Sequence, residues 1–228
     1  HDGETPRTER AAEAVRAGCT AFHVSLDVES PSGPRNREIG YQPRVGRRLR
    51  IDGVPVRSLG DWRASGSLLV FLPEELRAVK GPPAARRRVM DRLIEGIDPA
   101  FIATSTAYGS AVSQRNALLK RIRTGQAGIA GLGPWDHAVV ELGARIAIAR
   151  RRAVLDLDPL FRTWFERLGG AADARLVWEP SPHALADVAP DDVETTLADL
   201  VARNRDRDVA AAQTLSGPHR DDVWIGVD

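Results

Sequence analysis

The stretch from Leu68 to Glu95 reads LLVFLPEELRAVKGPPAARRRVMDRLIE and divides the chain into two kinds of sequence. It opens with a short apolar run, Leu68 to Leu72, which predicts a buried strand rather than a helix. Pro73 then stands at a first helical position. Glu74 and Glu75 follow, where carboxylates interact favourably with a helix dipole. We therefore expect strands before this point and helices after it.

Three consecutive arginines come after a Gly-Pro-Pro break at residues 81–83. Arg86, Arg87 and Arg88 occupy the first two turns of the next expected helix, where positive charge opposes the helix dipole. Helix stability therefore does not explain them, and they need a partner from elsewhere.

The composition fits a soluble globular protein of one or two domains, with 228 residues, 43% hydrophobic and 28% charged. No apolar run approaches the roughly 20 residues that span a bilayer, and the polar start lacks the apolar core of a signal peptide. We therefore expect a cytoplasmic protein with no membrane partner. Cys19 is the only cysteine, which excludes a disulfide framework. We expect it to be a buried residue near a strand.

The net charge of +1 conceals an uneven distribution. Residues 80–152 contain 13 basic and 5 acidic side chains, whereas residues 153–228 contain 7 basic and 15 acidic ones. Such a split predicts either pairing between the two parts of the chain or a basic face that binds a polyanion. Nearly all the cations are arginine, which suits bidentate contact with phosphate, and a genome-wide coding bias would give the same preference.

The first 72 residues predict a mainly antiparallel sheet. Ala21–Glu29 alternates apolar and polar side chains, which indicates a half-buried strand with His23 on its exposed face. Strand-like sequence follows at Glu38–Gln42 and Arg47–Val56, and Asp52 with the next glycine is a hairpin signal. The two helices expected in this region are Arg7–Ala17 and Ser58–Ala64.

The middle of the chain predicts a long antiparallel helical hairpin. One helix begins at Asp98 and keeps an apolar stripe to about Arg123. A glycine-rich loop at residues 125–133 follows, and a second helix runs from Pro134 to Leu168. Apolar spacings of three and four residues predict that the two helices pack together, and Pro159 should kink or split the second one.

The last third predicts a return to strands. We expect a strand at Ala174–Glu179, a helix from Asp191 or Asp192 to about Ala212, and a final strand at Val223–Val227. The alternating charges of residues 203–208 predict a solvated, salt-bridged face. The expected fold class is α+β, with a sheet region at 1–72, a helical region at 73–213 and a return to the sheet at 214–228.

No complete catalytic site or metal site is visible in the sequence. The phosphate-loop, dinucleotide, HExxH and GxSxG patterns are absent, and the histidines show no metal-ligand spacing. The segment SGPHRDD at residues 216–222 predicts a tight turn in which Asp221 or Asp222 bonds the backbone. The alternative is a loop at the edge of a phosphate or metal site. Glu74 is a second candidate, because sheets often bind ligands where a strand ends.

Four strings resemble the RecF family in order and spacing. They are FLPEELRAVKGPPAARRRVMDRL (71–93), SQRNALLK (113–120), PWD (134–136) and TLSGPHRDD (214–222). The family comprises bacterial DNA replication and repair ATPases related to the SMC-like branch of the ABC-type ATPases. The resemblance implies a partial ATPase sheet lobe with an inserted helical lobe. The phosphate loop would lie before His1, and the signature and Walker B motifs after Asp228.

The resemblance also implies roles for particular residues. Glu74 falls at a position similar to that of the loop that senses the γ-phosphate and Mg²⁺ in ABC-type ATPases. His219 and Arg220 match the family motif just before the signature region. These three are the cofactor-binding candidates. The basic middle third supplies the candidate DNA contacts, which are Arg86, Arg87, Arg88, Arg115, Lys120, Arg121 and Arg123.

The function implied is that of the middle part of an ATP-dependent DNA-binding protein of recombinational repair and replication restart. ATP and Mg²⁺ would join two copies on single-stranded or gapped DNA, with other recombination mediators as partners, in gap repair and SOS induction. The family is a weak DNA-dependent ATPase, and we expect this chain alone to be inactive and not to bind ATP tightly. The alternative is a non-enzymatic module in which the helical hairpin docks a partner protein.

Overall fold

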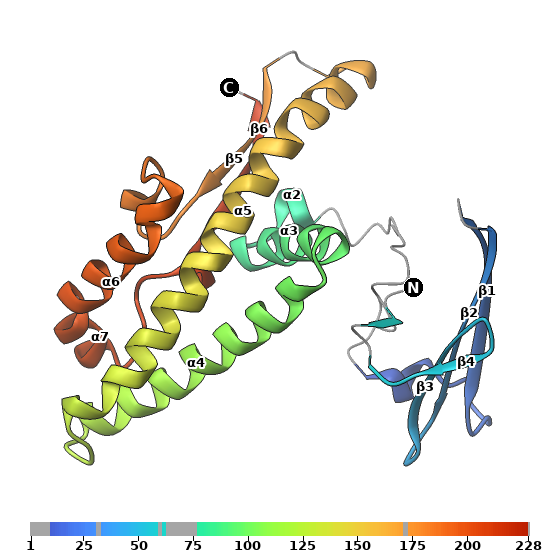
Figure 1. The fold of residues 1–228 in the computed structure, drawn as a ribbon, viewed down its shortest axis with the longest axis horizontal. Helices are drawn as coiled ribbons and strands as arrows, with labels where there is room; N and C mark the ends of the chain where they lie inside the picture. The colour runs from blue at the N-terminus through green and yellow to red at the C-terminus, as the bar shows by residue number, and fades with distance from the viewer. Residues whose placement is uncertain (1–9, 31–32, 59–60, 63–76, 171–172, 228) are drawn as a thin grey trace. The chain divides into compact units, whose positions relative to one another are not determined.

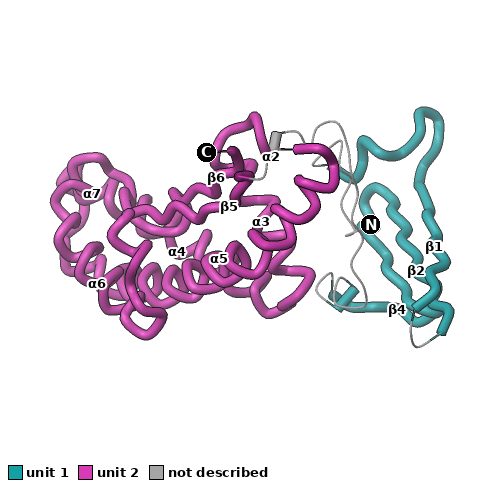
Figure 2. Tube along the Cα trace, turned by 90° about the horizontal axis from the view of Figure 1, so that it is seen from above, with its two compact units in different colours: residues 1–71 teal, residues 72–228 magenta. Residues whose placement is uncertain are grey.

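The computed structural model describes residues 10–30, 33–58, 61–62, 77–170 and 173–227. The chain divides into two compact units, residues 1–71 and 72–228 (Figure 2). Each is described by itself below. The strand expected at Leu68–Leu72 and the candidate Glu74 lie outside the described residues.

The first unit contains a four-stranded antiparallel sheet in chain order (Figure 1). Its strands are β1 (Phe22–Ser30), β2 (Gly33–Gln42), β3 (Gly46–Ile51) and β4 (Val54–Val56). The predicted hairpin turn is confirmed between β3 and β4, where Asp52 and Gly53 adopt φ of 50° and 77°. The Asp52 carboxylate accepts a hydrogen bond from the Asn36 backbone N–H at 2.8 Å, which fixes the turn against β2.

Burial in this sheet differs from the prediction. Three apolar side chains of β1 stay exposed within the described residues, with Val24 at 53%, Leu26 at 37% and Val28 at 38%, whereas Phe22 is half-buried. The buried side chains lie elsewhere: the Arg37 guanidinium stacks 3.8 Å from the ring centroid of Trp62. Alternation predicted the strand correctly, whereas burial depends on neighbours that a single strand does not reveal.

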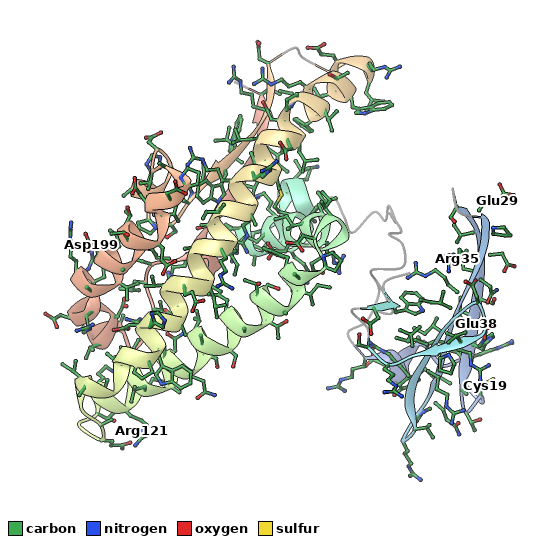
Figure 3. All side chains as sticks on the ribbon, in the orientation of Figure 1. Cys19, Glu29, Arg35, Glu38, Arg121 and Asp199 are labelled. Atoms are coloured by element: carbon green, nitrogen blue, oxygen red, sulfur yellow. The ribbon has the colours of Figure 1, made fainter. Side chains whose placement is uncertain are left out.

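Other predictions for this unit meet mixed outcomes. The expected helix Arg7–Ala17 is a 3₁₀ turn at Ala11–Ala14 in its described part. Residues 61–62 are helical, and the remainder of the expected Ser58–Ala64 helix is only partly described. Cys19 is exposed rather than buried (Figure 3). His23 is exposed as predicted, and its Nε2 lies 3.2 Å from a Glu38 carboxylate oxygen.

The second unit is mainly helical (Figure 1). Its α-helices are α2 (Arg77–Lys80), α3 (Pro83–Ile97), α4 (Ala100–Arg123), α5 (Gly133–Arg167), α6 (Val193–Arg203) and α7 (Arg205–Ala211). Short 3₁₀ turns lie at Ile129–Leu132, His183–Leu185, Pro190–Asp192 and Pro218–Arg220, the last being η6. None of the helices in the described residues is long and apolar enough to cross a membrane.

The predicted hairpin of α4 and α5 is confirmed. The two helices run side by side in opposite directions, and Leu119, Val139 and Ile146 on their facing stripes are at most 1% exposed (Figure 1). The predicted split at Pro159 is wrong, because α5 continues through it to Arg167. A proline removes one helical hydrogen bond and adds a steric clash. Helix α5 tolerates that cost.

The helix expected from Asp191 or Asp192 to Ala212 is two helices, with Asn204 between α6 and α7. The expected solvated face is also wrong in part. Asp208 is 1% exposed, and its carboxylate accepts hydrogen bonds from Arg115 and from the Leu215 backbone N–H. Arg203 is exposed, as predicted, and pairs at 3.3 Å with Asp199, which lies outside the predicted charge pattern.

The strands β5 (Ala174–Glu179) and β6 (Asp222–Val227) form an antiparallel pair, which confirms both predicted strands. Leu176, Trp178 and Val223 from the two strands join the core formed by the helices. Helix α5 packs against β5, and α3 packs against β6. The chain therefore returns to a strand beside the helical hairpin, and the segment before β6 lies against several helices.

A pair of glycine substitutions tests this packing. A Cβ at Gly143 in α5 would lie 3.0 Å from Leu197 and 3.2 Å from Tyr108, whereas a Cβ at Gly109 in α4 would meet nothing within 4 Å. We expect Gly143→Ala to lower the free energy of unfolding by about 1–3 kcal/mol through overpacking. Gly109→Ala should raise it by roughly 0.5–1 kcal/mol through helix propensity. Urea unfolding measures both, and stabilisation by both substitutions would contradict the close α5–α6 contact.

Candidate functional site

Residues Thr214 to Asp222 connect α7 to β6, and we call them the 214–222 segment. Gly217 adopts φ of 132°, a conformation that favours glycine, and a Cβ there would lie 2.5 Å from the Tyr108 hydroxyl. The Gly217 N–H donates to the Ser181 carbonyl at 2.7 Å. Glycine is therefore required at this position by both its backbone conformation and the close approach of Tyr108.

Asp221 is the buried anchor of the segment, at 1% exposure. Its carboxylate accepts hydrogen bonds from the Ser181 N–H at 2.8 Å, the Trp178 indole at 3.1 Å and Arg150 at 3.3 Å. Burial raises the pKa of Asp221, and the charge of Arg150 and these donors oppose that rise. The predicted tight turn is present as η6, and the predicted carboxylate–backbone bond is made by Asp222, which accepts from the Val223 N–H at 2.7 Å. Asp221 instead holds side chains and backbone from other elements.

Arg150 of α5 joins three parts of the unit. Its guanidinium forms a bidentate pair with Asp91 of α3, with N–O distances of 2.8 and 2.9 Å. The same side chain donates to the Pro218 carbonyl at 2.5 Å and reaches Asp221. Only 6% of it is exposed. Arg150 therefore holds α3, α5 and the 214–222 segment together and is not presented to solvent.

Two of the three consecutive arginines meet the acidic last third of the chain. Arg86 forms a bidentate pair with Asp222, both N–O distances being 2.7 Å, and the hydrogen bonds that it donates to Asp222 raise the pKa of Arg86. Arg87 donates to the Asp221 carbonyl. Arg88 is exposed. Of the predicted DNA contacts, Arg86 and Arg87 are thus already engaged within the chain, whereas Arg88 faces solvent.

Arg115 is buried, and the prediction that it contacts DNA needs correction. It is 0% exposed and pairs with Asp136 at 2.7 Å and Asp208 at 2.6 Å. Its guanidinium also donates to the Thr214 hydroxyl at 2.9 Å. A buried cation needs such partners, because an unpaired charge in the interior is costly. The folded chain leaves Arg115 no surface on which to meet a phosphate.

The remaining basic candidates lie at the end of α4. Lys120, Arg121 and Arg123 are exposed in its last turn, and Figure 3 labels Arg121 there. Cations at a helix C-terminus interact favourably with its dipole, so these positions are compatible with stability as well as with binding. The structure therefore separates exposed cations at the hairpin end from the arginines buried around the 214–222 segment.

His219 and Arg220 share one acceptor. The Thr214 carbonyl accepts from His219 Nε2 at 3.0 Å and from Arg220 Nε at 3.1 Å. His219 Nδ1 lies 2.8 Å from the Tyr108 hydroxyl and accepts a hydrogen bond from it, because Nε2 carries the hydrogen that is donated to the Thr214 carbonyl. Burial lowers the pKa of His219 and raises the pKa of Tyr108. His219 is therefore neutral at pH 7, and both of its ring nitrogens are occupied.

Sequence reasoning missed several members of this network. Tyr108 looked like a core residue on an apolar stripe, and Asp136, Asp208 and Thr214 carried no individual signal. Arg115 lies 21 residues from Asp136 and 99 from Thr214, and Tyr108 lies 111 residues from His219. The shared motif strings were the only available clue. Within the described residues, no three His, Cys, Asp or Glu side chains are grouped so that they could hold a metal ion.

Comparison with known proteins identifies relatives along nearly the whole chain, although no family model matches. The "DNA replication and repair protein RecF" of Tropheryma whipplei is 32% identical over 219 residues, covering 96% of this chain and 57% of that protein. The protein of the same name from Geobacter sulfurreducens is 35% identical over 219 residues, covering 95% of this chain and 58% of that protein.

A solved structure shows the same fold. The "recombination mediator protein RecF-ATP in RecFOR pathway" matches with a TM-score of 0.85 and 24% identity, covering 99% of this chain and 60% of that one. This similarity agrees with the α+β fold class, in which antiparallel strands accompany a helical hairpin. The chain spans less than two thirds of the length of these relatives. Over nearly its whole length, this chain is similar to part of these RecF proteins.

Proposed function

We propose that the chain is part of a RecF-like, ATP-dependent DNA-binding protein that acts in the cytoplasm in recombinational repair and replication restart. One observation carries the proposal: the shared motif strings converge on the 214–222 segment. Arg115 reaches Thr214 from α4, Arg86 reaches Asp222 from α3, and Asp136 at the start of α5 holds Arg115. Motifs far apart in sequence thus build one structure, which supports a common function for them.

The nucleotide side of the proposal rests on Glu74, His219 and Arg220. Among these, Arg220 offers an exposed guanidinium suited to phosphate. His219 cannot contact a nucleotide through its ring nitrogens without breaking its hydrogen bonds to Tyr108 or Thr214. We therefore propose that His219 holds the 214–222 segment in place and does not touch the phosphate. ATP with Mg²⁺, when bound, would lie between two copies of the protein, and its phosphates would supply the negative charge that Arg220 contacts. Glu74 as a γ-phosphate sensor stands on the resemblance alone.

The DNA side rests on exposed cations. Lys120, Arg121 and Arg123 lie together in the last turn of α4, and Arg88 lies exposed on α3. Such side chains suit contact with the phosphate backbone of single-stranded or gapped DNA, which depends on salt rather than on sequence. Dimerisation on DNA, contact with other recombination mediators and a part in SOS induction complete the proposal.

A second candidate function is a non-enzymatic module that docks a partner protein through the helical hairpin. The exposed apolar end of α5 favours it: Leu160 and Trp164 are each 58% exposed, and Leu168 just beyond the helix is 83% exposed. This alternative predicts partner binding by the 228-residue chain without ATP.

The complete reading frame distinguishes the two functions. We expect a glycine-rich phosphate loop within about 100 residues upstream, and a signature motif with an acidic apolar strand downstream. The product of that complete frame should bind ATP, measured by equilibrium dialysis, whereas the 228-residue chain should show neither tight binding nor turnover. Turnover by the 228-residue chain, or the absence of both motifs from the frame, would overturn the ATPase proposal.

A salt titration tests the DNA surface. Replacing Lys120, Arg121 and Arg123 together with alanine should weaken DNA binding at low salt. It should also reduce the slope of log affinity against log salt by up to about 3, since each phosphate contact contributes roughly 0.7–0.9. Arg152→Ala is the matched control, because the Arg152 side chain is 83% exposed on α5 and lies outside the proposed surface. An unchanged slope in the triple variant would exclude these residues as phosphate contacts.

The state of His219 predicts a pH dependence of stability. Its pKa is lowered in the folded chain, so the unfolded chain binds a proton near pH 6.5 that the folded chain does not. The free energy of unfolding should therefore be constant for this group above pH 6.5 and fall by up to about 1.4 kcal/mol per pH unit below it. Urea unfolding at pH 7.5, 6.5 and 5.5 measures this fall, which His219→Gln should reduce. Equal slopes in the two proteins would contradict a neutral, buried His219.

A further inference from the structure

Thr214 uses all of its polar groups to connect α4 with the residues assigned to the nucleotide. Its backbone N–H and its hydroxyl both donate to the Asn116 side-chain oxygen, at 2.7 and 2.8 Å. Its hydroxyl oxygen accepts from Arg115 at 2.9 Å. On its other side, its carbonyl accepts from both His219 and Arg220. Thr214 is 0% exposed, so water does not compete for these bonds.

The α4 side of this connection is itself held by charge. Arg115 is fixed between Asp136 and Asp208, and Asp208 also accepts from the N–H of Leu215, the residue after Thr214. Breaking such a buried pair is strongly unfavourable, whereas apolar residues of similar volume could replace it at little cost. Stability alone therefore does not account for the use of charged residues here. A fixed geometry for Thr214 and Leu215 does.

We propose that Asn116 and Arg115 are positioning residues that act through Thr214 to set the place of Arg220 for phosphate contact. Neither touches the phosphate. The Nε of Arg220 donates a hydrogen bond to the Thr214 carbonyl, and this bond fixes the position of Nε. The outer part of the side chain is exposed. Moving Thr214 would therefore move both Arg220 and the imidazole of His219, which share its carbonyl. The phosphate part of this inference rests on the proposed function, whereas the ordering of the segment does not.

The experiment uses Asn116, because it is half-buried and its loss leaves no buried charge unpaired. Asn116→Leu removes the acceptor of both Thr214 hydrogen bonds, and Asn116→Asp keeps an oxygen in that place. Hydrogen exchange without nucleotide should be about tenfold faster over residues 214–221 in the leucine variant. The aspartate variant should restore the slower rate. The matched control is Gln114→Leu, because Gln114 is an exposed polar residue of the same helix. This control should leave the exchange rate over residues 214–221 unchanged.

Two exchange results would overturn the positioning role. One is an unchanged rate over residues 214–221 in Asn116→Leu. The other is an equal rise over α6, which would indicate general destabilisation rather than local loosening. Because no nucleotide is present in this arm, its result stands whether or not the protein binds ATP.

The second arm measures coupling to Arg220 in the product of the complete reading frame. We expect Asn116→Leu and Arg220→Ala each to weaken ATP binding by about tenfold, and the double variant to be no weaker than Arg220→Ala alone. Multiplied losses in the double variant would show that Asn116 acts independently of Arg220 and would overturn the inference. If Arg220→Ala leaves ATP affinity unchanged, the assignment of Arg220 to the nucleotide fails, and with it the phosphate part of this inference. The exchange arm then decides the ordering role alone.

Discussion

The 214–222 segment depends on the neutralisation of arginines from three helices. Arg86 of α3 pairs with Asp222, Arg150 of α5 reaches Asp221, and Arg115 of α4 lies between two carboxylates and Thr214. This arrangement accounts for much of the uneven charge distribution in the sequence, because cations of the middle third meet anions of the last third inside the unit. The exposed remainder, concentrated at the end of α4, is what a polyanion could use.

Such a network determines position more than stability. Removing charge from water costs free energy that the attraction between the partners only partly repays, so buried ion pairs are weak stabilisers. Each guanidinium nonetheless has several donors in a fixed plane, and here they hold backbone carbonyls as well as carboxylates. The 214–222 segment is mostly irregular and lacks the regular backbone hydrogen bonds of a helix or sheet. These arginine contacts hold it in one conformation. Gly217 contributes the backbone geometry that no other residue adopts as readily.

Local patterns predicted local structure well. Apolar spacing identified α4 and α5, alternation identified β1, and the Asp52-Gly53 pair identified a hairpin. The errors came where distant partners decide the outcome. Asp208 looked solvated among alternating charges and is buried because Arg115 needs it. Pro159 was expected to kink or split its helix, yet α5 continues through it to Arg167.

The candidate site divides in the same way. The motif strings located the 214–222 segment and the arginines of α3, but residue type alone could not separate a surface cation from a buried one. Arg115 and Lys120 lie five positions apart on α4, one at 0% exposure and the other exposed. Periodicity places them on different sides of the helix, yet only the three-dimensional partners of Arg115 explain why a cation occupies the inner side.

Helix α4 therefore joins the two proposed binding surfaces. Asn116 contacts Thr214, and Lys120 follows it by one helical turn, so the same short length of helix holds the segment behind Arg220 and presents a cation for DNA. A phosphate that shifts the last turn of α4 would shift the acceptor of Thr214, and a nucleotide that draws Arg220 toward itself would pull on the same residue. If DNA and nucleotide bind as proposed, linkage requires that each change the affinity of the other by the same factor. The path between the two proposed surfaces is short: it runs from Lys120 along one turn of α4 to Asn116, and from there by hydrogen bonds to Thr214.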